Sequence, residues 1–136
     1  MFNLFTYGTL MCDDIMAEVS GPDCVLNPCK VTLKGYKRRK ISDENFPALV
    51  INPTGSVEGV LYPDLPDSAL KRLDIYEGDM YFRETVAVER EDGKTLKATA
   101  YIIKPEHEKD LGPDDWDFGE FLRKEKEDFM KQIWDI

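Results

Sequence analysis

The 136-residue sequence contains one histidine, His107, and three cysteines, and both scarcities argue against common kinds of site. A lone imidazole cannot supply a paired-histidine zinc site, and His107 stands between two glutamates, where a solvated side chain is expected. The cysteines have no C-x-x-C spacing, and we expect no disulfide between Cys24 and Cys29. The sequence therefore predicts no metal, no cofactor and no histidine-based catalytic triad.

Positive charge is also scarce, because the sequence has 18 Lys and Arg against 27 Asp and Glu, which gives a formal net charge of -9 at pH 7. Nucleic acids and anionic membranes would be repelled, so we expect neither as a partner. No apolar run approaches the roughly 20 residues that span a bilayer, and the first residues lack a basic leader. These absences favour a cytoplasmic protein that acts on a small molecule, and they leave its oligomeric state open.

The patterns that are present predict one mixed α+β domain over residues 1–136. A chain of this length, with 42% hydrophobic residues, can bury a core without disulfides or metal. Apolar or alternating runs predict strands at 2–7, 29–40, 47–51, 57–62, 81–90 and 97–103. Turn chemistry predicts hairpins across Asn52-Pro53-Thr54-Gly55 and across Asp92-Gly93. Helices are expected from Asp13, over 68–77 and over about 117–134.

Glu77 ends the second predicted helix, at a position where an acid is poorly tolerated. Asp67-Ser68 can cap this helix, its apolar residues recur at helical spacing from Leu70, and Gly78 is a stop signal. Glu77 lies roughly 20° from Leu70 on the edge of the apolar stripe, so it should point inward. Desolvation and the negative helix end both raise its pKa, which suits a proton-transfer group, although a structural role is the alternative. Asp74, on the other side, is expected to make a structural hydrogen bond.

The sequence Tyr7-Gly8-Thr9-Leu10 closes the first predicted strand and precedes the first helix. Backbone N–H groups after such a turn point into a common space and can bind a carboxylate or an oxyanion. On spacing alone, an ordinary strand-to-helix turn is the alternative. We expect that Gly8 cannot carry a side chain, because a Cβ would intrude on a close backbone approach and on a positive φ.

Three segments in order resemble the γ-glutamylcyclotransferase-like, or AIG2-like, family. They are Tyr7-Gly8-Thr9-Leu10, then Glu58-Gly59-Val60-Leu61-Tyr62, then Leu73-Asp74-Ile75-Tyr76-Glu77-Gly78 followed by Tyr81, Arg83 and Val86. The resemblance covers about residues 3 to 103, and the Tyr-Glu-Gly-x-x-Tyr-x-Arg run is similar to the small branch that includes γ-glutamylamine cyclotransferase. It implies a small, partly closed β-barrel flanked by helices, with a cavity at one mouth.

The same resemblance implies a reaction in which a γ-glutamyl amine or peptide is cyclised to 5-oxoproline and its amine is released. The substrate's own α-amine attacks its γ-carbonyl, so the protein needs positioning, one base and oxyanion stabilisation. By resemblance, Glu77 is the general acid/base, the backbone of Gly8, Thr9 and Leu10 holds the amino-acid end, and Tyr7 and Tyr81 shape the pocket. Arg83 either touches the substrate or pairs with an acid of the scaffold.

Two other classes of protein are compatible with these residues. An amide hydrolase would use Glu77 to activate water, and its product would be glutamate rather than a lactam. A non-enzymatic binding module for a γ-glutamyl-like ligand would keep the loop at 7–10 without needing a proton-shuttling acid.

Overall fold

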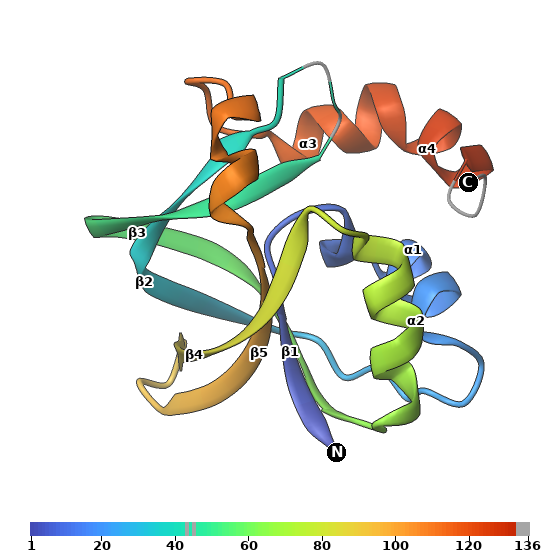
Figure 1. Ribbon diagram of the computed structural model, residues 1–136. Helices are drawn as coiled ribbons and strands as arrows, with labels where there is room; N and C mark the ends of the chain where they lie inside the picture. Colours follow the sequence, from blue (N-terminus) through green and yellow to red (C-terminus); the bar gives the residue numbers. More distant parts are fainter. Residues whose placement is uncertain (43, 45, 133–136) are drawn as a thin grey trace.

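Five strands of the described chain form a closed barrel (Figure 1). The computed structural model describes residues 1–42, 44 and 46–132. The strands follow one another around the barrel in the order β1-β3-β2-β4-β5 and have the bounds β1 Phe2–Thr6, β2 Cys29–Lys40, β3 Pro47–Leu65, β4 Tyr81–Arg90 and β5 Thr95–Ile103. All neighbours are antiparallel except β1 and β5, which meet in parallel at Leu4 and Thr99. The predicted α+β barrel is confirmed, and it is fully rather than partly closed.

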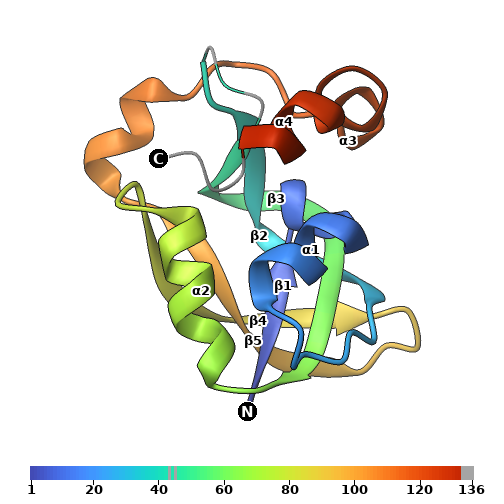
Figure 2. The ribbon, with the colours of Figure 1, turned by 90° about the vertical axis from the view of Figure 1, so that its right-hand side faces the viewer.

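The helical segments lie outside the barrel, with α1 and α2 side by side and α4 beside α1 (Figures 1 and 2). They are η1 Thr9–Met11, α1 Asp13–Ser20, α2 Ser68–Glu77, η2 Pro105–Asp110, α3 Phe118–Glu120, the π-helical η3 Phe121–Glu125 and α4 Lys126–Gln132. An ion pair of 3.0 Å between Lys126 and Asp14 joins α4 to α1. In the part of the chain that is described, no helix combines the length and apolarity needed to cross a membrane.

The predicted hairpin across residues 52–55 is wrong, because 47–51 and 57–62 belong to the single long strand β3. Both parts pair with β2, and the register shifts where Lys34 faces Ser56 while Tyr36 faces Ile51. The turn-forming residues 52–55 make a bulge in β3, in which the Thr54 N–H donates to Asn52 Oδ1 at 3.2 Å. The partner strand β2, with twelve residues, is long enough to hold both halves in line.

The other local signals gave the expected turns. The β4–β5 hairpin is confirmed: the Arg90 N–H donates to the Lys94 carbonyl at 2.8 Å, and Gly93 has φ 87°. Helix α2 ends at Gly78, with φ 76°. Asp67, however, does not cap α2 through its side chain, and instead pairs with the α-ammonium group of Met1 at 3.0 Å.

The last predicted helix is confirmed over its described length, from α3 through η3 to α4. The Asp117 carboxylate accepts a hydrogen bond from the Glu120 N–H at 2.9 Å and caps its start. Its predicted end near Trp134 lies outside the described residues. A π-helical turn in the middle changes which residues face the barrel, and Phe121 becomes fully buried there.

Strand β1 is buried on both faces, which determines where the following loop lies. Successive side chains of a strand point in opposite directions, and Leu4 packs into the core between barrel and helices while Phe5 packs into a second core inside the barrel. Leu73 of α2 belongs to the first core and is also fully buried. The loop after β1 and the end of α2 are therefore held by the same packed layer.

Candidate active site

The structure brings the Tyr7-Gly8-Thr9-Leu10 loop, Glu77 and Tyr81 to one cavity of about 240 Å³. The loop, the end of α2, the segment before β3 and α4 all contribute residues to the cavity. Its lining consists of Leu4, Phe5, Thr6, Tyr7, Gly8, Thr9, Leu10, Glu44, Phe46, Pro47, Tyr76, Glu77, Tyr81, Tyr101 and Phe129.

Glu77 reaches this cavity because it is the last residue of α2, one turn after the buried Leu73. The residue is partly exposed. Burial raises the pKa of Glu77 from its ordinary value of 4.5 to about 8. Among the described lining residues none is Lys, Arg or His, so no basic side chain stabilises the carboxylate. The empty site therefore favours the protonated acid at neutral pH, and a bound ammonium group would favour the carboxylate.

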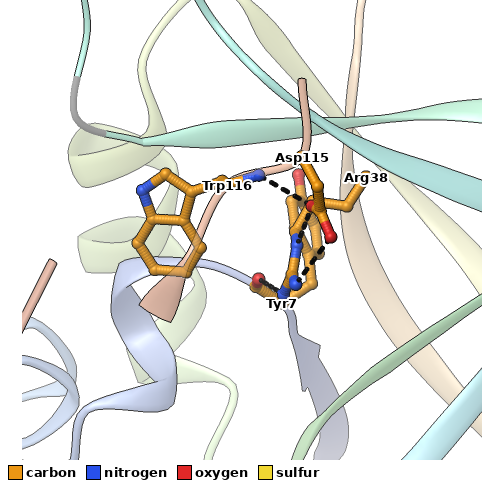
Figure 3. A network of polar contacts seen from close by, with 4 residues as sticks. All are labelled: Tyr7, Arg38, Asp115 and Trp116. Atoms are coloured by element: carbon orange, nitrogen blue, oxygen red, sulfur yellow. Dashed lines mark hydrogen bonds and ion pairs between the residues drawn. The ribbon is translucent and has the colours of Figure 1, made fainter. Parts of the chain in front are cut away.

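The backbone of the loop is fastened to the barrel by a network that contains Arg38 (Figure 3). Arg38 Nη1 donates to the Tyr7 carbonyl at 2.9 Å, and Arg38 Nε donates to the Asp115 carboxylate at 2.8 Å. The Trp116 N–H also donates to Asp115, and the Arg38 guanidinium lies 5.6 Å from the centre of the Trp116 ring. Arg38 and Asp115 were not predicted from the sequence, because 77 residues separate them and neither belongs to a motif.

Gly8 is required by a close approach, not by its backbone angles. Its φ is -127°, so the predicted positive φ is wrong. A Cβ at this position would lie 2.9 Å from Pro47 Cδ, a distance shorter than Cβ atoms show in proteins, so a side chain here would clash. The following residues, Thr9 and Leu10, begin η1, and the first N–H groups of such a turn have no acceptor within it. Both residues line the cavity.

The tyrosines at the cavity are oriented by the scaffold. The Tyr7 hydroxyl donates to the Tyr101 carbonyl, and the Tyr81 hydroxyl donates to the Pro47 carbonyl at 2.9 Å. Both hydroxyl protons are thereby used, so Tyr7 and Tyr81 present oxygen lone pairs, which suit an ammonium group. The Tyr76 hydroxyl is hydrogen-bonded to Thr9 Oγ1 and ties α2 to the loop.

Tyr76, Tyr101 and Phe129 line the cavity although the sequence did not single them out as site residues. Tyr76 stands next to Glu77 in the motif, which is the one signal that identifies it. Tyr101 and Phe129 belong to an apolar strand and an amphipathic helix, where aromatic residues usually form core.

Arg83 does not line the cavity. Its Nε lies 3.3 Å from Asp74 Oδ1, and Asp74 also accepts a hydrogen bond from the Tyr101 hydroxyl. Of the two roles considered for Arg83, the structure therefore shows the pairing with a scaffold acid. The expected structural hydrogen bond of Asp74 is confirmed.

His107 lies on η2, 3.6 Å from Asp110, and does not line the cavity. The three cysteines are free. Over residues 1–42, 44 and 46–132, no group of three or more His, Cys, Asp or Glu side chains is arranged to hold a metal ion.

The small closed barrel, with the loop at 7–10 and an acid of raised pKa lining one cavity, has a cyclotransferase-like fold. Comparison with known families agrees, since the model of the family described as "Gamma-glutamyl cyclotransferase, AIG2-like" matches residues 4–118. The chain belongs to this family. The match includes the loop, Glu77 and Tyr81, and it ends before most of the C-terminal helix.

The chain is also similar to known relatives and to solved structures. The chain is 31% identical to AIG2-like protein C of Arabidopsis thaliana over 132 residues, covering 95% of this chain and 74% of the relative. A solution structure of an Arabidopsis thaliana protein superposes with a TM-score of 0.73 at 26% identity, covering 96% and 87% of the two chains. A γ-glutamyl cyclotransferase structure has a TM-score of 0.67 at 18% identity, covering 99% and 87%, which shows a shared fold.

Proposed function

We propose that this protein is a γ-glutamyl cyclotransferase that converts a γ-glutamyl amine or peptide to 5-oxoproline and releases the amine. One observation carries the proposal. The Glu77 carboxyl, with its pKa raised by burial, lines the same cavity as residues 8–10. Family membership makes cyclisation the leading reaction. Among the described lining residues only Glu44 is also charged, and it is exposed, which makes Glu77 the proton carrier.

The reaction begins when the substrate's ammonium group binds beside Glu77 and the oxygens of Tyr7 and Tyr81. Its positive charge favours the carboxylate, which then removes one proton from the ammonium. The neutral amine attacks the γ-carbonyl carbon, and the developing oxyanion is stabilised by hydrogen-bond donors of the site. The N–H groups of Thr9 and Leu10 are available either for this oxyanion or for the substrate carboxylate.

Collapse of the tetrahedral intermediate breaks the bond between the γ-carbon and the leaving nitrogen. Glu77 gives the proton that it took from the ammonium to that nitrogen as the bond breaks, and the ring nitrogen then loses its second proton through the same carboxylate to the departing amine. The amine leaves as an ammonium ion, and the ring that remains is 5-oxoproline. Glu77 is a carboxylate again after these transfers, as it was when the substrate had bound, and no covalent bond to the protein forms. Because the attack is intramolecular, holding the γ-glutamyl chain in a folded conformation supplies much of the rate enhancement.

The decisive experiment is product analysis with purified protein. A panel of γ-glutamyl amides and γ-glutamyl peptides is incubated with the parent protein and with Glu77→Gln, and 5-oxoproline and glutamate are quantified by mass spectrometry. We expect 5-oxoproline from at least one substrate, and turnover lowered by on the order of 100-fold or more in the variant. Glutamate without lactam would indicate a hydrolase. Tight binding of a γ-glutamyl amide without any product would indicate a binding module.

A further inference from the structure

Some residues that line the cavity are buried and others are exposed to solvent. This difference determines which end of a bound substrate would point to solvent. The loop at 7–10, Pro47, Tyr81 and Tyr101 are buried. Five lining residues are partly or fully exposed: Glu77, and four residues that we call the rim, which are Glu44, Phe46, Tyr76 and Phe129. Under the proposed function the amino-acid end of the substrate binds at the buried loop and at Glu77. The leaving amine, on the far side of the γ-carbonyl, must then point to the rim.

The rim is aromatic and lacks positive charge. Three of its four side chains are aromatic rings, and no Lys or Arg is found among the described residues that line the cavity. Its one charged member, Glu44, is an acid that would repel a carboxylate on the leaving group. A γ-glutamyl amino acid or peptide would place its own carboxylate in this region without a partner, at a cost in binding.

Phe129 is held in place before any ligand binds. Its ring meets Phe121 edge to face with the centroids 5.4 Å apart, and it meets Tyr76 edge to face at 6.3 Å. Phe121 is fully buried, so this row of rings is anchored in the core and ends at the cavity. An aromatic ring on the leaving amine can pack against Phe129 in the same edge-to-face geometry, which aromatic pairs favour. Because Phe129 is already held in place, little conformational entropy is lost when the substrate binds.

Phe129 also comes from a part of the chain that the family match does not cover, since that match ends at residue 118. We propose that the rim, and Phe129 in particular, selects γ-glutamyl amides of aromatic amines and disfavours leaving groups that carry a carboxylate. This inference rests on the proposed function, because it assigns the leaving-group end of the same cavity.

The test compares kcat/KM for γ-glutamyl benzylamide, γ-glutamyl methylamide and γ-glutamylglycine. For the parent protein we expect the benzylamide to exceed the other two by on the order of 10-fold or more. Phe129→Ala should lower the ratio of benzylamide to methylamide by about 10-fold, and Phe129→Leu, which keeps apolar bulk without the ring, should lower it less. Within one preparation this ratio does not depend on the folded fraction, and comparing variants cancels the intrinsic reactivity of the amides.

Phe118→Ala is the matched control, because Phe118 starts the same helical segment, packs against Trp116 and does not line the cavity. It should leave the ratio unchanged. An unchanged ratio in both Phe129 variants, or γ-glutamylglycine turned over as well as the benzylamide, would overturn the inference. In those cases, release of 5-oxoproline from the methylamide would still support the proposed function. If none of the three yields 5-oxoproline while another γ-glutamyl substrate of the wider panel does, the inference fails and the proposed function stands; if no substrate of the panel does, both fail.

Discussion

Replacing Glu77 by Gln should stabilise the fold at neutral pH while removing activity. The folded protein holds the Glu77 proton more tightly than the unfolded chain does, since the pKa rises from 4.5 to about 8 on folding. A carboxyl with a raised pKa supports folding fully below about pH 4.5, and this support is lost as pH rises towards the folded pKa near 8. Glutamine is uncharged at every pH and nearly the same shape, so it does not incur this loss.

The size of the effect follows from the two pKa values. Each pH unit between 4.5 and 7 contributes about 1.4 kcal/mol, because Glu77 ionises in the unfolded chain but keeps its proton in the folded protein. The unfolding free energy is therefore lower by about 3 kcal/mol at pH 7 than at low pH. Glu77 is partly exposed to solvent, which makes this figure an upper limit. In a domain of this size, 1 kcal/mol corresponds to a shift in Tm of roughly 4 °C.

The assay is chemical denaturation of the parent protein and Glu77→Gln at several pH values from 4 to 9. The difference in unfolding free energy should move in favour of Gln between about pH 5 and 8 and then level off. Leu73→Val is the control, because it changes a buried apolar residue of the same helix and introduces no titrating group. Its difference from the parent should not vary with pH. A Glu77→Gln protein that loses stability relative to the parent as pH rises would refute the reasoning, because it would mean that the native carboxylate is well paired.

The other predictions concern activity. The acidic limb of the kcat/KM profile should have an apparent pKa near 8. The acidic limb of the kcat profile should have a lower apparent pKa, because the bound ammonium group favours the carboxylate. Equal apparent pKa values in the two profiles, or an acidic limb that persists in Glu77→Gln, would contradict this. Gly8→Val should abolish binding of a γ-glutamyl amide, measured by calorimetry, more than it lowers Tm, since its Cβ collides with Pro47; a co-crystal with ligand bound elsewhere would reject the site. Arg38→Met should lower the unfolding free energy by about 1 to 3 kcal/mol, measured by denaturation. It should also lower kcat/KM, because the Tyr7 carbonyl loses its hydrogen bond to Arg38; an unchanged kcat/KM would show that this hydrogen bond is not needed for activity. Turnover should survive exhaustive chelation, and a loss restored by one divalent ion would disprove this.

Local sequence patterns predict several of the residues that line the cavity. Helical spacing from Leu70 to Glu77, followed by Gly78, places the acid at an inward-facing helix end, because both signals depend only on neighbouring residues. The strand that leads into Tyr7-Gly8 and the hairpin at Asp92-Gly93 are equally local.

The sequence alone determined the helix that carries Glu77, the loop at 7–10 and the family, because short-range periodicity and ordered motifs encode them. Only the tertiary structure decided that β3 runs through its turn-like residues, since pairing with β2 outweighed the local signal at 52–55. It also decided that Arg38 holds the Tyr7 carbonyl and that Phe129 reaches the cavity. These contacts join residues far apart in the chain, and their energies come from packing and desolvation that no local pattern records.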